Sequence, residues 1–173
     1  LELRPLVAAE SWQLIEQIAG PSSVRLRGQA ERLIEQAAGV PFFVSELARH
    51  LAGDIDPDEA AALGLDSLLS LRMAGLPSEC HLVLDVMSVA GAPLAQDVVL
   101  RAAGLSDANR GLLTNLERLS VLRTTDSTRR TSEVYHHRIR EQVLSAMPAP
   151  KRAAYHRSIA MALLSTANPN LLT

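Results

Sequence analysis

A glycine and a proline two residues apart, Gly39 and Pro41, divide the first third of this chain into helical segments. Apolar residues recur at helical spacing before Gly39, and a second helical pattern begins at Pro41. Glycine tolerates the left-handed backbone that ends a helix. Proline fits the first turn of the next helix, where its missing N–H would have no partner. The sequence therefore predicts a rigid corner between two helices, of a kind that either faces a ligand or only separates helices.

The composition favours helices over sheets. Aromatic residues make up 3% of the 173 residues and hydrophobic residues 47%, so leucine, alanine and valine must fill the core. The single cysteine, Cys80, cannot form an internal disulfide, which indicates a reducing compartment, and we expect the cytoplasm. No apolar run is long enough to span a membrane. Since the chain starts without methionine, we expect it to be a piece of a longer polypeptide.

The order of elements predicts a mainly α fold. Helical patterns cover residues 8–19, 30–38, 41–51, 65–73, 78–90, 95–103 and 106–119, and another pattern follows a predicted cap at Asp56 with Glu59. Two β-prone runs, 121–125 and 131–135, flank a polar turn and predict a hairpin. Helices return at 137–147 and, after Pro148 and Pro150, run to about Leu164. Three helices followed by a hairpin is the order of a winged helix.

The sequence lacks the motifs of a self-contained enzyme. It has no glycine-rich phosphate loop, no Rossmann fingerprint, no zinc-ligand spacing and no framed nucleophilic serine. We therefore expect no catalytic residue and no metal ligand, and no enzyme activity from this chain on its own.

Two adjacent histidines, His136 and His137, lie where the second hairpin strand meets a helix. Backbone N–H groups point outward at a helix start, and an imidazole there can bind an anion. Arg138 and Arg140 add positive charge. A phosphate contact and a purely structural role are both compatible with this pattern.

Two segments resemble one family. Residues 38–47, AGVPFFVSEL, are similar to the "GGNPFF-x-x-EL" element of the signal-transduction ATPases with numerous domains (STAND), which are relatives of AAA+ ATPases. Residues 135–144, YHHRIREQVL, resemble their "F-x-HD-x-IREA-x-Y" element, and residues 147–160 the "LP-x-x-x-R-x-x-x-H-x-x-IA" that follows. Such regions occur in bacterial serine/threonine kinases and hybrid histidine kinases with a fused ATPase, in LuxR-type transcription regulators and in adenylate cyclases.

The resemblance implies a helical lid bundle at residues 1–56, a winged-helix domain with a small β-hairpin at 57–147, and the start of a C-terminal helical arm at 148–173. ATP or ADP would bind the intact parent against an upstream nucleotide-binding domain of the same chain, and no cofactor is expected in the fragment. In the family, the residues matching Pro41 and His136 contact adenine and the β-phosphate of ADP. The family's aspartate is His137 here. The resemblance implies a conformational switch in which release of the ADP clamp reorients the arms, often with oligomerisation of the parent.

The main alternative is a winged-helix module that binds DNA or a protein. Residues 121–173 carry a net charge of +5 and the rest of the chain −7, so a basic end could meet phosphate or an acidic domain. The helix that would enter DNA, 106–120, carries Arg110 and Arg118 against Asp107 and Glu117 and is neutral. DNA-reading helices are usually basic, so the sequence disfavours DNA as a partner. A purely structural helical scaffold is the other alternative, although no repeat period appears.

Overall fold

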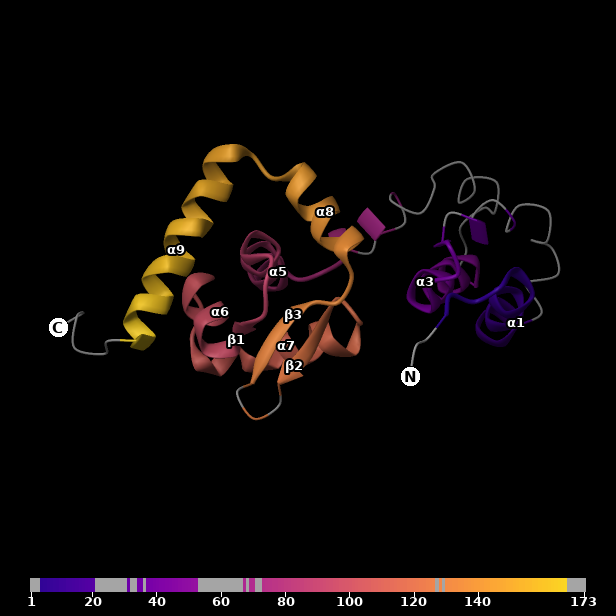
Figure 1. Cartoon of the computed structure of the whole chain (residues 1–173), viewed down its shortest axis with the longest axis horizontal. Helices are drawn as coiled ribbons and strands as arrows, with labels where there is room; N and C mark the ends of the chain where they lie inside the picture. The colour runs from indigo at the N-terminus through magenta and orange to yellow at the C-terminus, as the bar shows by residue number, and fades with distance from the viewer. Residues whose placement is uncertain are drawn as a thin grey trace. The chain divides into compact units, whose positions relative to one another are not determined.

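The computed structural model describes residues 4–20, 31, 34–35, 37–52, 67, 69–70, 73–126, 128 and 130–167. The chain divides into two compact units, Leu1–Gly75 (unit 1) and Leu76–Thr173 (unit 2). Figure 1 shows a mainly helical chain with one small antiparallel sheet of three strands, which confirms the predicted fold class. The division between the units falls after Gly75, while the functional boundaries after residues 56 and 147 stay predictions.

Unit 1 is built on two helices that pack against each other, α1 (Ala8–Ala19) and α3 (Pro41–Leu51). Both have the bounds that the sequence predicts. Ile15 from α1 and Phe43 and Leu47 from α3 are almost completely buried and form this core. Between the helices, the described positions 31, 34, 35 and 37 are helical. The predicted cap at Asp56 and Glu59 lies outside the described residues.

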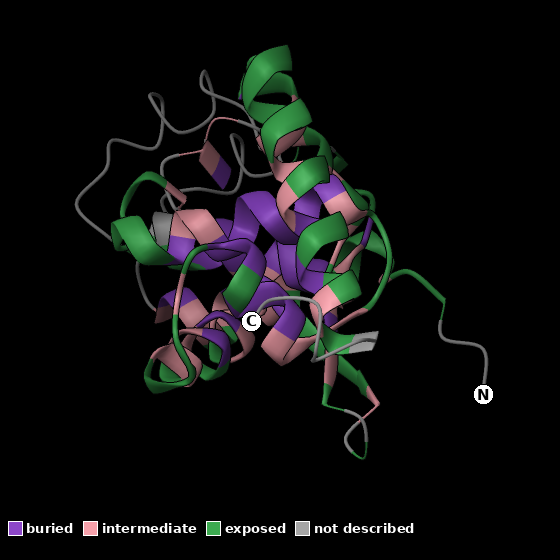
Figure 2. Cartoon of the chain, turned by 90° about the vertical axis from the view of Figure 1, so that its left-hand side faces the viewer, coloured by how far each residue is buried: buried purple, intermediate pink, exposed green. Residues whose placement is uncertain are grey.

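Unit 2 is built around α5 (Ser78–Ala90), which is buried on nearly every side. Cys80 and all residues from 83 to 89 are buried. Because seven consecutive residues of α5 are buried, other elements must enclose this helix on all sides there, and Figure 2 shows buried residues at the centre of the unit. Gly91 ends the helix at φ 65°, a left-handed conformation that glycine adopts at low cost.

The helices around α5 follow in the predicted order. They are α6 (Gln96–Ala102), a 3₁₀ turn η2 (Asp107–Asn109), α7 (Arg110–Arg118), α8 (His137–Ala146) and α9 (Ala149–Ala167). Ser106 precedes η2, and Asn109 Oδ1 accepts from the backbone N–H of Ser106 at 3.1 Å. The predicted single helix 106–119 is thus a 3₁₀ turn followed by an α-helix.

The sheet has the strand order β1-β3-β2. The predicted hairpin is formed by β2 (Leu122–Asp126) and β3 (Thr131–Val134), with Leu122 opposite Val134. The sequence did not predict β1 (Leu94–Ala95), which places Leu94 opposite Ser132. A strand of two residues has no periodicity of its own, so only its pairing with β3 defines it.

The last helix belongs to unit 2 by its contacts. α9 packs along α6 and α5, and it extends past the predicted end at Leu164 to Ala167. Met147 and Pro148 are not helical and separate α8 from α9. Pro150 lies inside the first turn of α9, where the missing backbone N–H of proline costs little stability. Within the part of the chain described above, no helix combines the length and the apolarity that a membrane crossing requires.

Candidate functional site

The corner before Pro41 is a tight turn of left-handed residues. Ala38 and Gly39 have φ angles of 49° and 67°, and Pro41 then begins α3. The backbone N–H of Val40 donates to the carbonyl oxygen of Ala37 at 2.9 Å, which closes the turn. Pro41 is exposed, and Ser45 Oγ donates to its carbonyl oxygen at 2.8 Å. The ring of Pro41 is therefore presented to solvent from a fixed backbone.

The segment that precedes α1 explains why residue 39 is glycine. The backbone N–H of Leu6 donates to the carbonyl oxygen of Gly39 at 2.8 Å. A Cβ atom at Gly39 would overlap the carbonyl oxygen of Leu6 and lie 2.9 Å from its nitrogen. Only glycine permits this close approach together with the positive φ. The corner is thus fixed by a distant part of unit 1 as well as by its own turn.

His136 caps the N-terminus of α8. Its backbone is extended, at φ −137° and ψ 138°, and its Nδ1 accepts from the backbone N–H of Arg138 at 3.3 Å. Tyr135, just before it, donates through its backbone N–H to the carbonyl oxygen of Val121 at 2.9 Å, which ties this corner to the start of β2. Ile139, 2% exposed, anchors the first turn of α8 in the core.

The surroundings of His136 disfavour protonation of its ring. Burial lowers the pKa of the imidazole, and the charges of His137 and Arg138 lower it further, while Glu141 acts in the opposite direction. The two histidine rings lie 4.4 Å apart with an angle of 33° between their planes. A neutral imidazole that accepts at Nδ1 carries its proton on Nε2. His136 is therefore held as the tautomer that can donate from Nε2, the form that suits a phosphate oxygen.

Pro41 belongs to unit 1 and His136 to unit 2. Their convergence on one nucleotide stays a prediction. His81 is half-buried in α5 and His156 is exposed on α9, while the side chain of His50 lies outside the described residues.

Each unit also has a cleft of its own. One, in unit 1, has a volume of about 500 Å³ and is lined by Ala8, Ala9, Trp12, Glu31, Ile34 and Glu35. The other, in unit 2, has a volume of about 370 Å³ and lies beside Arg101 and Asp107. The described lining of these clefts includes neither Pro41 nor His136. Among the described residues, no three His, Cys, Asp or Glu side chains cluster as a metal site would require.

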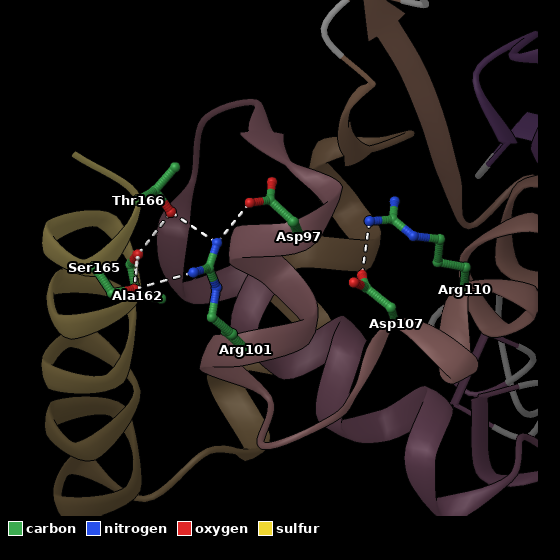
Figure 3. Close-up of polar contacts among 7 residues, drawn as sticks. All are labelled: Asp97, Arg101, Asp107, Arg110, Ala162, Ser165 and Thr166. Carbon is green, nitrogen blue, oxygen red and sulfur yellow. Dashed lines mark hydrogen bonds and ion pairs between the residues drawn. The ribbon is translucent and has the colours of Figure 1, made fainter. Parts of the chain in front are cut away.

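Sequence reasoning missed the polar contacts that hold α9. Arg101 of α6 donates to Ser165 Oγ at 3.3 Å and to Thr166 Oγ1 at 2.8 Å, and it also binds Asp97 at 2.6 Å (Figure 3). Residues so far apart in sequence cannot be paired from one chain alone.

A second contact holds the other end of α9. Asp85 of α5 is 9% exposed and accepts from Tyr155 Oη at 3.1 Å, and its carboxylate lies 2.8 Å from Lys151 Nζ. A lone carboxylate inside the apolar run from 83 to 89 was the signal that could have indicated a buried partner, since an unpaired buried charge is costly.

Comparison of the chain with protein-family models, with curated proteins and with solved structures gives no match.

Proposed function

We propose that this chain is a regulatory, non-catalytic part of a STAND-type signalling ATPase, in which unit 1 supplies the lid and unit 2 the winged helix. The observation that carries the proposal is the cap at His136, because it selects the Nε2 tautomer at the start of a helix. Helix N-termini attract phosphate through outward backbone N–H groups and the positive end of the helix dipole. His136 would contact the β-phosphate of ADP held by a nucleotide-binding domain upstream in the same polypeptide.

The corner at Pro41 supports the same proposal. Its ring is exposed and rests on a backbone that Gly39 and Leu6 fix. A preorganised apolar surface binds a flat base with little loss of conformational entropy. We propose that Pro41 packs beside adenine in the parent protein.

The arrangement of unit 2 supports a winged helix. Its elements run in the order α5, β1, α6, α7, β2, β3, and the strands pair as β1-β3-β2. A winged helix has this order of elements: a helix, a short strand, two helices and a hairpin. The second strand of the hairpin, β3, lies between β1 and β2 in the sheet. The parent would be a bacterial kinase or transcription regulator that works in the cytoplasm, with this region as its nucleotide-sensing switch.

The charges of unit 2 favour this proposal over DNA binding. Arg110 binds Asp107 at 2.7 Å, and Arg123 binds Glu133 at 2.6 Å. Arginines that are already paired with carboxylates contribute little to phosphate contacts, and those contacts dominate affinity for DNA. The exposed residues of α7 are Gly111, Thr114 and Arg118. Only one of these three residues carries a positive charge that could contact a DNA phosphate.

The experiment measures the rate at which labelled ADP leaves the intact parent protein. His136→Asp keeps an N-cap acceptor but replaces a donor by an anion, so we expect ADP to leave at least about tenfold faster, which corresponds to about 1.4 kcal/mol. Pro41→Ala removes the apolar contact with the base and should also speed release.

His156→Asp, an exposed change on α9, is the matched control and should leave the rate unchanged. Release rates that are unchanged in both His136→Asp and Pro41→Ala would contradict the proposal. Retention of the helical circular dichroism signal shows that the His136→Asp variant is folded.

A further inference from the structure

The helix α9 carries most of the exposed large apolar side chains among the described residues of unit 2. Three of the five exposed large apolar side chains in the described structure lie in one stretch of four residues on this helix. They are Met161, Leu163 and Leu164, at 53%, 45% and 56% exposure. Figure 2 shows α9 exposed along much of its length, over the buried centre of the unit. At about 100° per residue, Met161 and Leu163 lie on opposite flanks of the face that carries Leu164, so Leu164 is the large apolar side chain at the centre of the exposed side.

The exposed residues form a stripe with the spacing of a helix-pairing surface. Ala153, Arg157, Ala160 and Leu164, which we call the outer stripe, are separated by four, three and four residues, and all are exposed. Alternation of three and four residues is the repeat by which one helix packs along another. Alanine at two of the four positions allows a second helix to approach closely.

The opposite side of α9 is already occupied. Ile159 and Ala162 are buried against the unit, and Tyr155 is half-buried against Asp85. The contacts of Arg101 with Ser165 and Thr166 hold the C-terminal end on the same side (Figure 3). α9 therefore cannot turn its outer stripe inward without losing these contacts, and the stripe is presented on a fixed support.

The charge of α9 indicates the chemistry of a partner. The helix carries Lys151, Arg152 and Arg157 and no acidic residue. Lys151 binds Asp85, and Arg152 donates to the carbonyl oxygen of Leu144 at 3.0 Å. Within the described parts of the chain, no carboxylate pairs with Arg157, which lies in the middle of the outer stripe. A partner with carboxylates beside its apolar positions would complement this surface.

We propose that the outer stripe of α9 binds an acidic amphipathic helix of another protein. Its apolar side chains would pack on Ala160 and Leu164, and one of its carboxylates would pair with Arg157. This surface lies on a different helix from His136, and the proposal does not depend on nucleotide binding.

Two other occupants fit the surface less well. A second copy of the chain would place one cationic α9 against another, with no acidic residue on either helix to offset the repulsion. A membrane surface favours helices with bulky aromatic side chains on the apolar face, whereas the outer stripe has two alanines and no aromatic residue.

The test uses two labelled synthetic helices with the same leucines at heptad positions a and d, one with glutamates and one with lysines at the flanking positions. Fluorescence anisotropy with the 173-residue chain should show at least about tenfold tighter binding of the glutamate peptide. Leu164→Glu should weaken that binding about tenfold, and Arg157→Glu should reverse the preference between the peptides.

The matched control is Arg118→Glu, which makes the same charge change at an exposed position of α7 and should change neither affinity. Circular dichroism checks that each variant is folded. Equal affinity for both peptides, no binding up to millimolar concentration, or binding unaffected by Leu164→Glu would overturn the proposal. Two further results would overturn the proposal if the glutamate peptide failed to bind. One is self-association in sedimentation that Leu164→Glu abolishes, and the other is binding to anionic lipid vesicles that Leu164→Glu abolishes.

Discussion

At the scale of single residues, His136 combines two roles that a sequence motif does not separate. Its Nδ1 is part of the fold, since it satisfies the backbone N–H of Arg138. Its position at the start of α8 also makes it the candidate phosphate contact. The same ring therefore links the stability of unit 2 to pH, because protonation of Nδ1 would abolish the cap.

The pH dependence has a definite sign. The pKa of His136 is lowered from its ordinary 6.5, so below pH 6.5 the unfolded chain binds more protons than the folded one. The contribution of the ring to stability is therefore present above pH 6.5 and is lost as the pH falls through the lower pKa of the folded state. We expect His136→Asn, which keeps a capping side chain, to lose less stability than the wild-type chain between pH 7 and pH 5.

Urea unfolding of both chains at the two pH values measures this difference. His156→Asn, an exposed histidine on α9, controls for removal of a histidine. An identical loss of stability in the wild-type and His136→Asn chains would show that the cap does not titrate as proposed.

At the scale of elements, α9 is held on unit 2 by polar contacts near both of its ends and by buried apolar residues between them. Near the N-terminal end of α9, Asp85 accepts a hydrogen bond from Tyr155 and forms an ion pair with Lys151. Near the C-terminal end, Arg101 donates hydrogen bonds to Ser165 and Thr166. Burial raises the pKa of Tyr155 to about 12, with the charge of Asp85 and its hydrogen bond adding to the effect. This tyrosine is therefore a reporter of whether α9 is docked.

In the wild-type chain, the raised pKa of Tyr155 means that the stability contributed by this contact is lost as the pH rises from 10 toward 12.

We expect Asp85→Asn to lower the pKa of Tyr155, because the carboxylate that disfavours the tyrosinate is gone. Ultraviolet absorbance of tyrosinate, followed in a Tyr135→Phe background, measures the titration of Tyr155 alone, since the chain has two tyrosines. Glu141→Gln, an exposed change on α8, should leave the titration where it is. An unchanged titration in Asp85→Asn would argue against the contact.

At the scale of the whole molecule, each unit has its own core. Leu47 is completely buried in unit 1, and Leu116 is completely buried in unit 2. Separate cores allow each unit to unfold without the other. The switch that we propose, in which the lid and the winged helix reorient, needs this property, because each part must keep its structure as it moves.

Leu47→Ala should therefore destabilise unit 1 by about 2–5 kcal/mol, the usual cost of such a truncation in a core, and leave the amides of α5 as protected as before. Leu116→Ala should have the converse effect, with α3 unchanged and α5 less protected. Hydrogen exchange followed residue by residue compares the two variants. Equal loss of protection in both units for either variant would mean that the chain unfolds as one body.

The sequence by itself determined the positions and types of the main elements. Helical periodicity, Gly39, Pro41 and the β-prone runs are local signals, and α1, α3 and the β2–β3 hairpin lie where those signals place them. The sequence also indicates the strand-to-helix junction at His136 and His137, whereas the cap that His136 forms there is seen only in the structure. The functions expected of Pro41 and His136 came from a resemblance, and they stay predictions.

Only the tertiary structure decided what these elements touch. Strand β1 exists because β3 lies beside it, Gly39 is required because Leu6 crosses it, and Asp85 is buried because Tyr155 and Lys151 reach it from α9. Each of these facts joins residues more than thirty positions apart. Local sequence fixes backbone preferences within a few residues, whereas such pairings depend on the free energy of packing the whole unit.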